Sequence, residues 1–106
     1  MRLLFIAIAA LLLLGCAAEA MKIDKLLSEP EKYLGEKVTL RGTVEDSVKL
    51  GDLSGFTLDD GTGKIFVSSE TLPPEGKTAT VSGTLMKQQI FLSTRYYVLA
   101  KDLNWN

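Results

Sequence analysis

Beyond residue 37, apolar and polar residues alternate one by one, and this period of two constrains the fold more than any other feature. The clearest stretches are residues 38–44 and 79–85, where an apolar side chain or a glycine occupies every second position. Successive side chains of a β-strand point to opposite faces, so each stretch predicts a strand with one buried face. Asp60-Gly61-Thr62-Gly63 lies between two further apolar runs and predicts a tight hairpin turn.

Five strands are expected in total, near residues 38–45, 56–59, 65–67, 79–85 and 90–103, the last with a candidate break near Ser93-Thr94. Their short connections leave no room for helices between parallel strands, which favours an antiparallel barrel or sandwich. Gly42 and Gly83 fall at inward positions of two long strands. They indicate places where the sheet coils sharply to close.

A short amphipathic helix is expected before the strands. Ile23, Leu26 and Leu27 have the spacing i, i+3 and i+4 of one helical face. Pro30 ends this helix and begins a second turn, which stops at Gly35.

The first residues predict an export signal. Arg2 precedes twelve unbroken apolar residues, 3–14, a run too short to span a bilayer comfortably and typical of the core of a signal peptide. Leu13-Leu14-Gly15-Cys16 resembles the bacterial lipobox, in which the cysteine is lipidated, although Leu14 departs from its preferred residues. Ala18-Glu19-Ala20 is a competing cleavage site that would release a soluble protein. Because Cys16 is the one cysteine, lipidation is the preferred interpretation.

Three segments of the strand region carry a family resemblance. Residues 38–44, 56–67 and 76–85 resemble the OB-fold domains of the tRNA-anticodon-binding-like group. The resemblance implies an all-β, five-stranded antiparallel OB-type barrel with a short N-terminal helix. Residues 1–15 would be the signal peptide, 16–35 the anchor, linker and helix, and 36–106 the barrel.

One departure from that family concerns the helix that usually lies between the third and fourth strands. Residues 69–76 are too few for it and contain Pro73-Pro74. We therefore expect the N-terminal helix to cover an open end of the barrel instead.

Composition argues against catalysis. The chain has no histidine, and its serines lack a base. The acidic pairs Glu45-Asp46 and Asp59-Asp60 are expected at strand ends and turns rather than around a metal. No enzyme activity, metal or cofactor is therefore expected. Without residues 1–15, 11 basic residues face 13 acidic ones, a net charge of −2 that disfavours a phosphate-binding groove.

What remains is a binding face, which the resemblance places on the outside of strands two and three. Phe66 is expected to point outward there, either to stack on a ligand or to lie under a covering segment. Lys49 and Lys87 are expected in two flanking loops, residues 48–54 and 86–89. The ligand would be an envelope protein, peptide or glycan; the alternatives are a single-stranded nucleic acid or an accessory role in an envelope complex. The candidate binding residues are Arg41, Thr43, Thr57, Phe66, Lys49 and Lys87.

Overall fold

A computed structural model describes residues 20–105 of the chain. The predicted signal segment and Cys16 lie outside the described residues. Within residues 20–105, no helix has the length and apolar character needed to cross a membrane.

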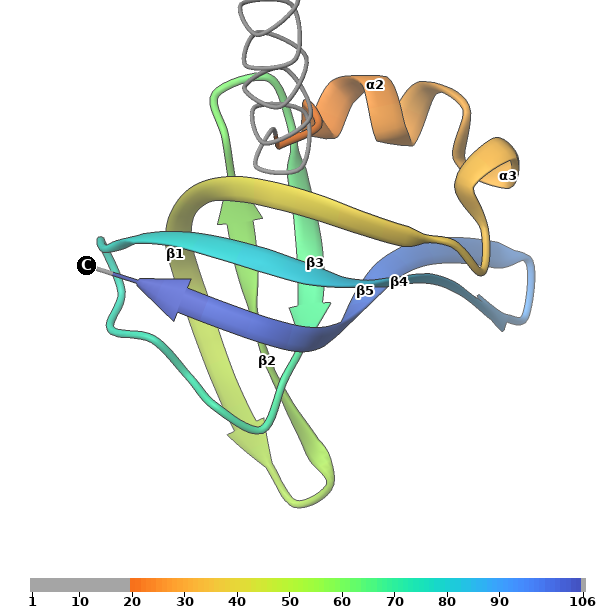
Figure 1. Ribbon diagram of the computed structural model, residues 1–106. Helices are drawn as coiled ribbons and strands as arrows, with labels where there is room; N and C mark the ends of the chain where they lie inside the picture. Colours follow the sequence, from red (N-terminus) through yellow and green to blue (C-terminus); the bar gives the residue numbers. More distant parts are fainter. Residues whose placement is uncertain (1–19, 106) are drawn as a thin grey trace, which may run out of the picture.

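Five strands close into one barrel, with two short helices at its N-terminal side (Figure 1). Around the barrel the strands follow the order β1-β2-β3-β5-β4. The elements are α2 (Ile23–Ser28), α3 (Pro30–Tyr33), β1 (Lys37–Leu50), β2 (Leu53–Asp59), β3 (Lys64–Ser68), β4 (Thr78–Ile90) and β5 (Ser93–Trp105).

The barrel is mixed, so the prediction of a purely antiparallel barrel is wrong for one strand pair. β3 and β5 run parallel, with Phe66 opposite Tyr97 and Ser68 opposite Leu99. The other four pairings are antiparallel. A closed ring of five strands cannot alternate direction all the way round, because five is odd. One parallel pair is therefore a consequence of closure.

Alternation along the strands builds the core as predicted. Inward residues of all five strands join two residues of α2 in a single apolar cluster. The buried members are Ile23, Leu26, Val38, Leu40, Val44, Phe56, Leu58, Ile65, Val67, Ala79, Val81, Leu85 and Val98.

Two inward glycines lie where neighbouring backbones cross closely. A Cβ on Gly42 would lie 2.5 Å from the carbonyl oxygen of Asp59, and one on Gly83 would collide with the carbonyl oxygen of Leu99. The register of the β4–β5 pair also shifts between Ser82 and Gly83. Both glycines therefore lie where two backbones approach too closely for a side chain.

The N-terminal helix, expected to cover an open end of the barrel, packs against the core. Ile23 and Leu26 of α2 are 0% exposed. Residues 69–77, between β3 and β4, contain no helix.

The predicted last strand is in fact parts of two strands. β4 continues to Ile90, a two-residue turn follows at Phe91 and Leu92, and β5 begins at Ser93. The loop expected at residues 86–89 is therefore strand, and Lys87 belongs to β4. The break expected near Ser93-Thr94 falls two residues before that position, at Phe91 and Leu92, which are not typical turn residues.

Candidate ligand-binding face

The outer surface of β2, β3 and β5 carries two aromatic side chains side by side. Phe66 of β3 is paired with Thr57 of β2 on one side and with Tyr97 of β5 on the other. The Phe66 ring lies over Gly55, where an added Cβ would meet its Cζ at 2.5 Å. Glycine at this position lets the ring lie close against the sheet, which leaves Phe66 half-buried. We call the outer surface of β2, β3 and β5 the ligand-binding face.

Two hollows lie along this face and share Ser68. The first, of about 540 Å³, contains Phe66 and Tyr97 together with residues of α2, β2 and β4. The second, of about 740 Å³, lies where β3 leaves the sheet and β5 continues. The first is lined by Leu27, Leu53, Lys64, Ile65, Phe66, Ser68, Gln88, Arg95, Tyr96 and Tyr97.

The larger hollow is polar and carries more negative than positive side chains. Ser54, Ser68, Ser69 and Thr71 supply hydroxyls. Its charged residues are Asp52, Glu70, Lys101 and Asp102. Three carboxylates against one ammonium give this hollow a formal charge of −2, which repels phosphate.

The smaller hollow contains two basic residues, one with an ion pair and one without. Lys64 lies 3.1 Å from a carboxylate oxygen of Glu45 and 4.0 Å from one of Asp59. The hydrogen bond with Glu45 raises the pKa of Lys64, with further attraction from Glu45 and Asp59. Arg95 has no ion pair among residues 20–105. Arg95 is therefore the cation of this hollow that is available to a ligand.

Of the predicted binding residues, the structure brings Thr57 and Phe66 together as cross-strand neighbours. Arg41 and Thr43 lie elsewhere. Both are on β1, which β2 separates from β3, and they line a separate hollow with Asp59 and Thr78. The strand alternation was predicted correctly, but the curvature of a closed barrel turns β1 away from Phe66.

The two predicted loop lysines differ in their surroundings. Lys49 is exposed at the end of β1, next to the β1–β2 turn at Gly51 and Asp52. Lys87 donates a hydrogen bond of 2.8 Å to Glu31 of α3, and the Tyr96 hydroxyl donates one of 2.7 Å to the same oxygen. The bond from Lys87, followed by that from Tyr96, lowers the pKa of Glu31. Lys87 thus holds α3 to the β4–β5 hairpin.

Sequence reasoning missed Arg95, Tyr97 and Ser68 as members of the ligand-binding face. The alternation around Tyr96 and Tyr97 implies that one of them faces outward, and the structure identifies it as Tyr97. Its position beside Phe66 depends on the parallel β3–β5 pairing, for which no local pattern exists.

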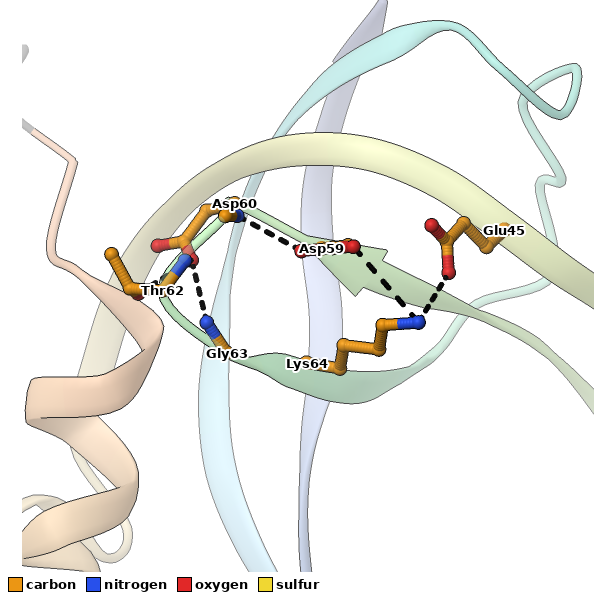
Figure 2. A network of polar contacts seen from close by, with 7 residues as sticks. Glu45, Asp59, Asp60, Thr62, Gly63 and Lys64 are labelled. Atoms are coloured by element: carbon orange, nitrogen blue, oxygen red, sulfur yellow. Dashed lines mark hydrogen bonds and ion pairs between the residues drawn. The ribbon is translucent and has the colours of Figure 1, made fainter.

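The β2–β3 hairpin does not form a second ligand site, because its polar groups bind one another (Figure 2) and also bind α2. One oxygen of Asp60 accepts hydrogen bonds from the backbone N–H groups of Thr62, at 2.9 Å, and Gly63, at 3.1 Å, and from the Thr62 hydroxyl, at 2.6 Å. Its other oxygen accepts one of 2.8 Å from the N–H of Ile23, and the Thr62 hydroxyl accepts one of 3.2 Å from the N–H of Asp24. The turn thus caps the start of α2.

The electrostatics of Asp60 agree with this capping role. Partial burial raises the pKa of its carboxyl group, but the hydrogen bonds from Thr62, Ile23 and Gly63 outweigh it and leave the pKa below its ordinary value. Within residues 20–105 no cluster of three or more histidine, cysteine, aspartate or glutamate side chains could hold a metal.

Comparison with solved structures supports the fold. Asparaginyl-tRNA synthetase from Pyrococcus horikoshii, complexed with asparaginyl-adenylate, matches 83% of this chain with a TM-score of 0.66 and 19% identity. The chain spans 22% of that synthetase. The hypothetical protein ygiW from E. coli matches 85% of this chain and 92% of its own length, with a TM-score of 0.59 and 18% identity.

The barrel is an OB fold. The strand order and the two structural neighbours agree on this. No protein-family model and no curated protein sequence matches the chain. At identities of 18–19%, the neighbours bear on the fold alone.

Proposed function

We propose that this chain is a non-enzymatic binding module of the cell envelope, exported and held at a membrane through lipidated Cys16. Its OB fold would bind an extended, uncharged ligand, a glycan or a peptide segment of a protein, across the ligand-binding face. OB folds bind oligosaccharides and oligonucleotides on this surface. One observation carries the proposal. The adjacent aromatic side chains of Phe66 and Tyr97 lie beside a hydroxyl-rich hollow whose formal charge is −2.

The aromatic pair Phe66 and Tyr97 can contact a ligand with flat or apolar faces. Phe66 and Tyr97 are opposite each other in register, and both line the smaller hollow. A sugar ring or an apolar side chain can pack on such a surface, while the serine hydroxyls of the larger hollow bond to polar groups further along the ligand. The polyanion phosphate backbone would meet three carboxylates there.

A single-stranded nucleic acid is the second candidate. Phe66 and Tyr97 could stack on bases, which contributes about 1–3 kcal/mol per base in other proteins. Arg95 adds an unpaired cation beside them. The likeness to an asparaginyl-tRNA synthetase is compatible with this candidate through the fold.

Calorimetric titration of the chain from residue 20 onward distinguishes the candidates. The probes are an oligomer of N-acetylglucosamine, a mixed peptide pool and a mixed-sequence single-stranded oligonucleotide, each at low and high salt. We expect binding of the glycan or peptide with little salt dependence, because few counterions are released. Oligonucleotide affinity that falls steeply with salt would support the second candidate instead.

Calorimetric titration of three alanine variants tests whether the ligand binds at the ligand-binding face. Phe66→Ala and Tyr97→Ala should each weaken binding about tenfold or more, since each removes a central aromatic contact. Arg41→Ala is the control, because Arg41 is exposed on β1 and lines a different hollow. Equal losses in all three variants would overturn the assignment of the ligand-binding face.

A further inference from the structure

The tip of the β4–β5 hairpin presents large apolar side chains to solvent. Phe91 is 95% exposed and Leu92 is 103% exposed, and Ile90 beside them is half exposed. Phe91 also has a φ of +54°, in the left-handed region that tight hairpin turns usually fill with glycine, asparagine or aspartate. Neither turn geometry nor the core accounts for phenylalanine and leucine here.

The hairpin that carries this tip is basic. Its two strands, Thr78–Ile90 and Ser93–Trp105, contain three basic residues, Lys87, Arg95 and Lys101, and one acidic residue, Asp102. Lys101 and Asp102 lie near the end of β5, away from the tip. Of the two basic residues nearer the tip, Lys87 forms an ion pair with Glu31, and Arg95 forms none among residues 20–105. The hairpin therefore combines an apolar tip with an unpaired arginine that attracts anions.

The shape of the tip favours a bilayer as its occupant. Two fully exposed side chains on a two-residue turn form a convex point, whereas a stable protein–protein interface needs about 800 Å² from each partner. A bilayer needs no complementary pocket: apolar side chains enter the acyl boundary, while basic residues contact anionic headgroups. We propose that Phe91 and Leu92 insert into the interface of an anionic membrane.

The length of the β4–β5 hairpin allows its tip to contact a membrane. β4 is paired with β1 as far as Thr84, and Ile90 lies six residues further, about 20 Å at the strand rise of 3.3 Å. The N–H of Met21 already donates to Thr39 of β1. Met21 follows Cys16 by five residue steps, which span at most about 18 Å. An anchor at Cys16, which is part of the proposed function, would keep the hairpin tip within reach of the same membrane.

Single tryptophans in the full chain test the insertion. In a Trp105→Phe background, tryptophan is placed by Phe91→Trp, by Leu92→Trp and, as the matched control, by Leu50→Trp. Leu50 is 70% exposed at the β1–β2 hairpin, whose turn contains Asp52. Each chain is mixed with vesicles of phosphatidylcholine and phosphatidylglycerol in which the phosphatidylcholine carries bromine on its acyl chains. Circular dichroism verifies the fold of each variant.

The expected result is a fall of about twofold in the fluorescence at positions 91 and 92 and no comparable fall at position 50. Binding to the vesicles is measured separately, by flotation in a density gradient. Chains that float with the vesicles yet show equal quenching at positions 91 and 50 would overturn the insertion of Phe91 and Leu92 and leave the anchor at Cys16 intact. Chains that do not float would overturn both the insertion and the anchor. The ligand titration would still test whether the ligand-binding face binds a glycan or peptide. A blue shift at position 91 that grows with protein concentration without vesicles would assign the tip to a second copy and overturn the proposal.

Discussion

The antiparallel hairpins β2–β3 and β4–β5 have turns of opposite chemistry. At Asp60-Gly61-Thr62-Gly63, the Asp60 carboxylate closes the turn (Figure 2), and the side-chain oxygens of Asp60 and Thr62 cap α2. At the β4–β5 turn, Phe91 and Leu92 point into solvent, and Phe91 has a backbone conformation that costs an L-residue about 1–2 kcal/mol.

The difference between the two turns indicates which hairpin stabilises the fold. The β2–β3 turn is saturated with internal hydrogen bonds and positions the helix that supplies Ile23 and Leu26 to the core. The β4–β5 tip adds nothing to the core, so its sequence is explained better by what it contacts outside the barrel.

The largest expected effect is the loss of a core side chain on the helix that the β2–β3 turn caps. Leu26→Ala should lower the free energy of unfolding by about 2–5 kcal/mol, because Leu26 is fully buried. Leu92→Ala is the control at the other hairpin and should change it by no more than about 0.5 kcal/mol. Urea unfolding followed by circular dichroism measures both. Comparable losses would show that the tip packs against the barrel.

Removing the cap itself should have the next largest effect. Asp60→Ala deprives the N–H groups of Ile23, Thr62 and Gly63 of their acceptor, and loss of such a cap costs about 1–2 kcal/mol. Asp52→Ala in the β1–β2 turn is the control, because Asp52 caps no helix. A stability unchanged by Asp60→Ala would refute the capping role.

The capping carboxylate also predicts a pH dependence. The pKa of Asp60 is lower in the folded chain than its ordinary value of 3.8, so its contribution is present above that value and is lost as pH falls through the folded pKa. The difference in Tm between the natural chain and Asp60→Asn should therefore be constant at neutral pH and shrink below a pH of about 4. A difference that widens in acid would contradict this sign.

At the β4–β5 turn the expected stability effect is smaller and of opposite direction. Phe91→Asn should raise the free energy of unfolding by about 0.5–1 kcal/mol, because asparagine tolerates the left-handed conformation better. Ile90→Asn, just before the turn, should bring no such gain. Thermal unfolding of the two variants measures the difference. A destabilised Phe91→Asn would mean that the phenylalanine ring stabilises the barrel.

Sequence patterns predicted the parts of this molecule that local chemistry determines. The alternation along β1 and β4 gave the core side chains, and the Asp60 turn residues gave the β2–β3 hairpin. Closing five strands requires a parallel pair, but local patterns do not say which two strands form it, so the pairing of Phe66 with Tyr97 could not be predicted in this way. Arg41 was grouped with Phe66 because alternation gives the side of a strand but not how far the barrel curves. The β4–β5 turn lies two residues before the break expected at Ser93-Thr94, because Phe91 and Leu92 are not turn-forming residues.

The central claim is that the ligand-binding face recognises an uncharged, extended ligand. Backbone amide shifts of the chain from residue 20 onward, recorded while an N-acetylglucosamine oligomer or a peptide is added at two salt concentrations, test it most directly. The account predicts shifts centred on Phe66, Ser68 and Tyr97, unchanged by salt and absent at Arg41. Shifts centred on Arg41 and Thr43, or shifts seen only with an oligonucleotide and lost at high salt, would contradict it.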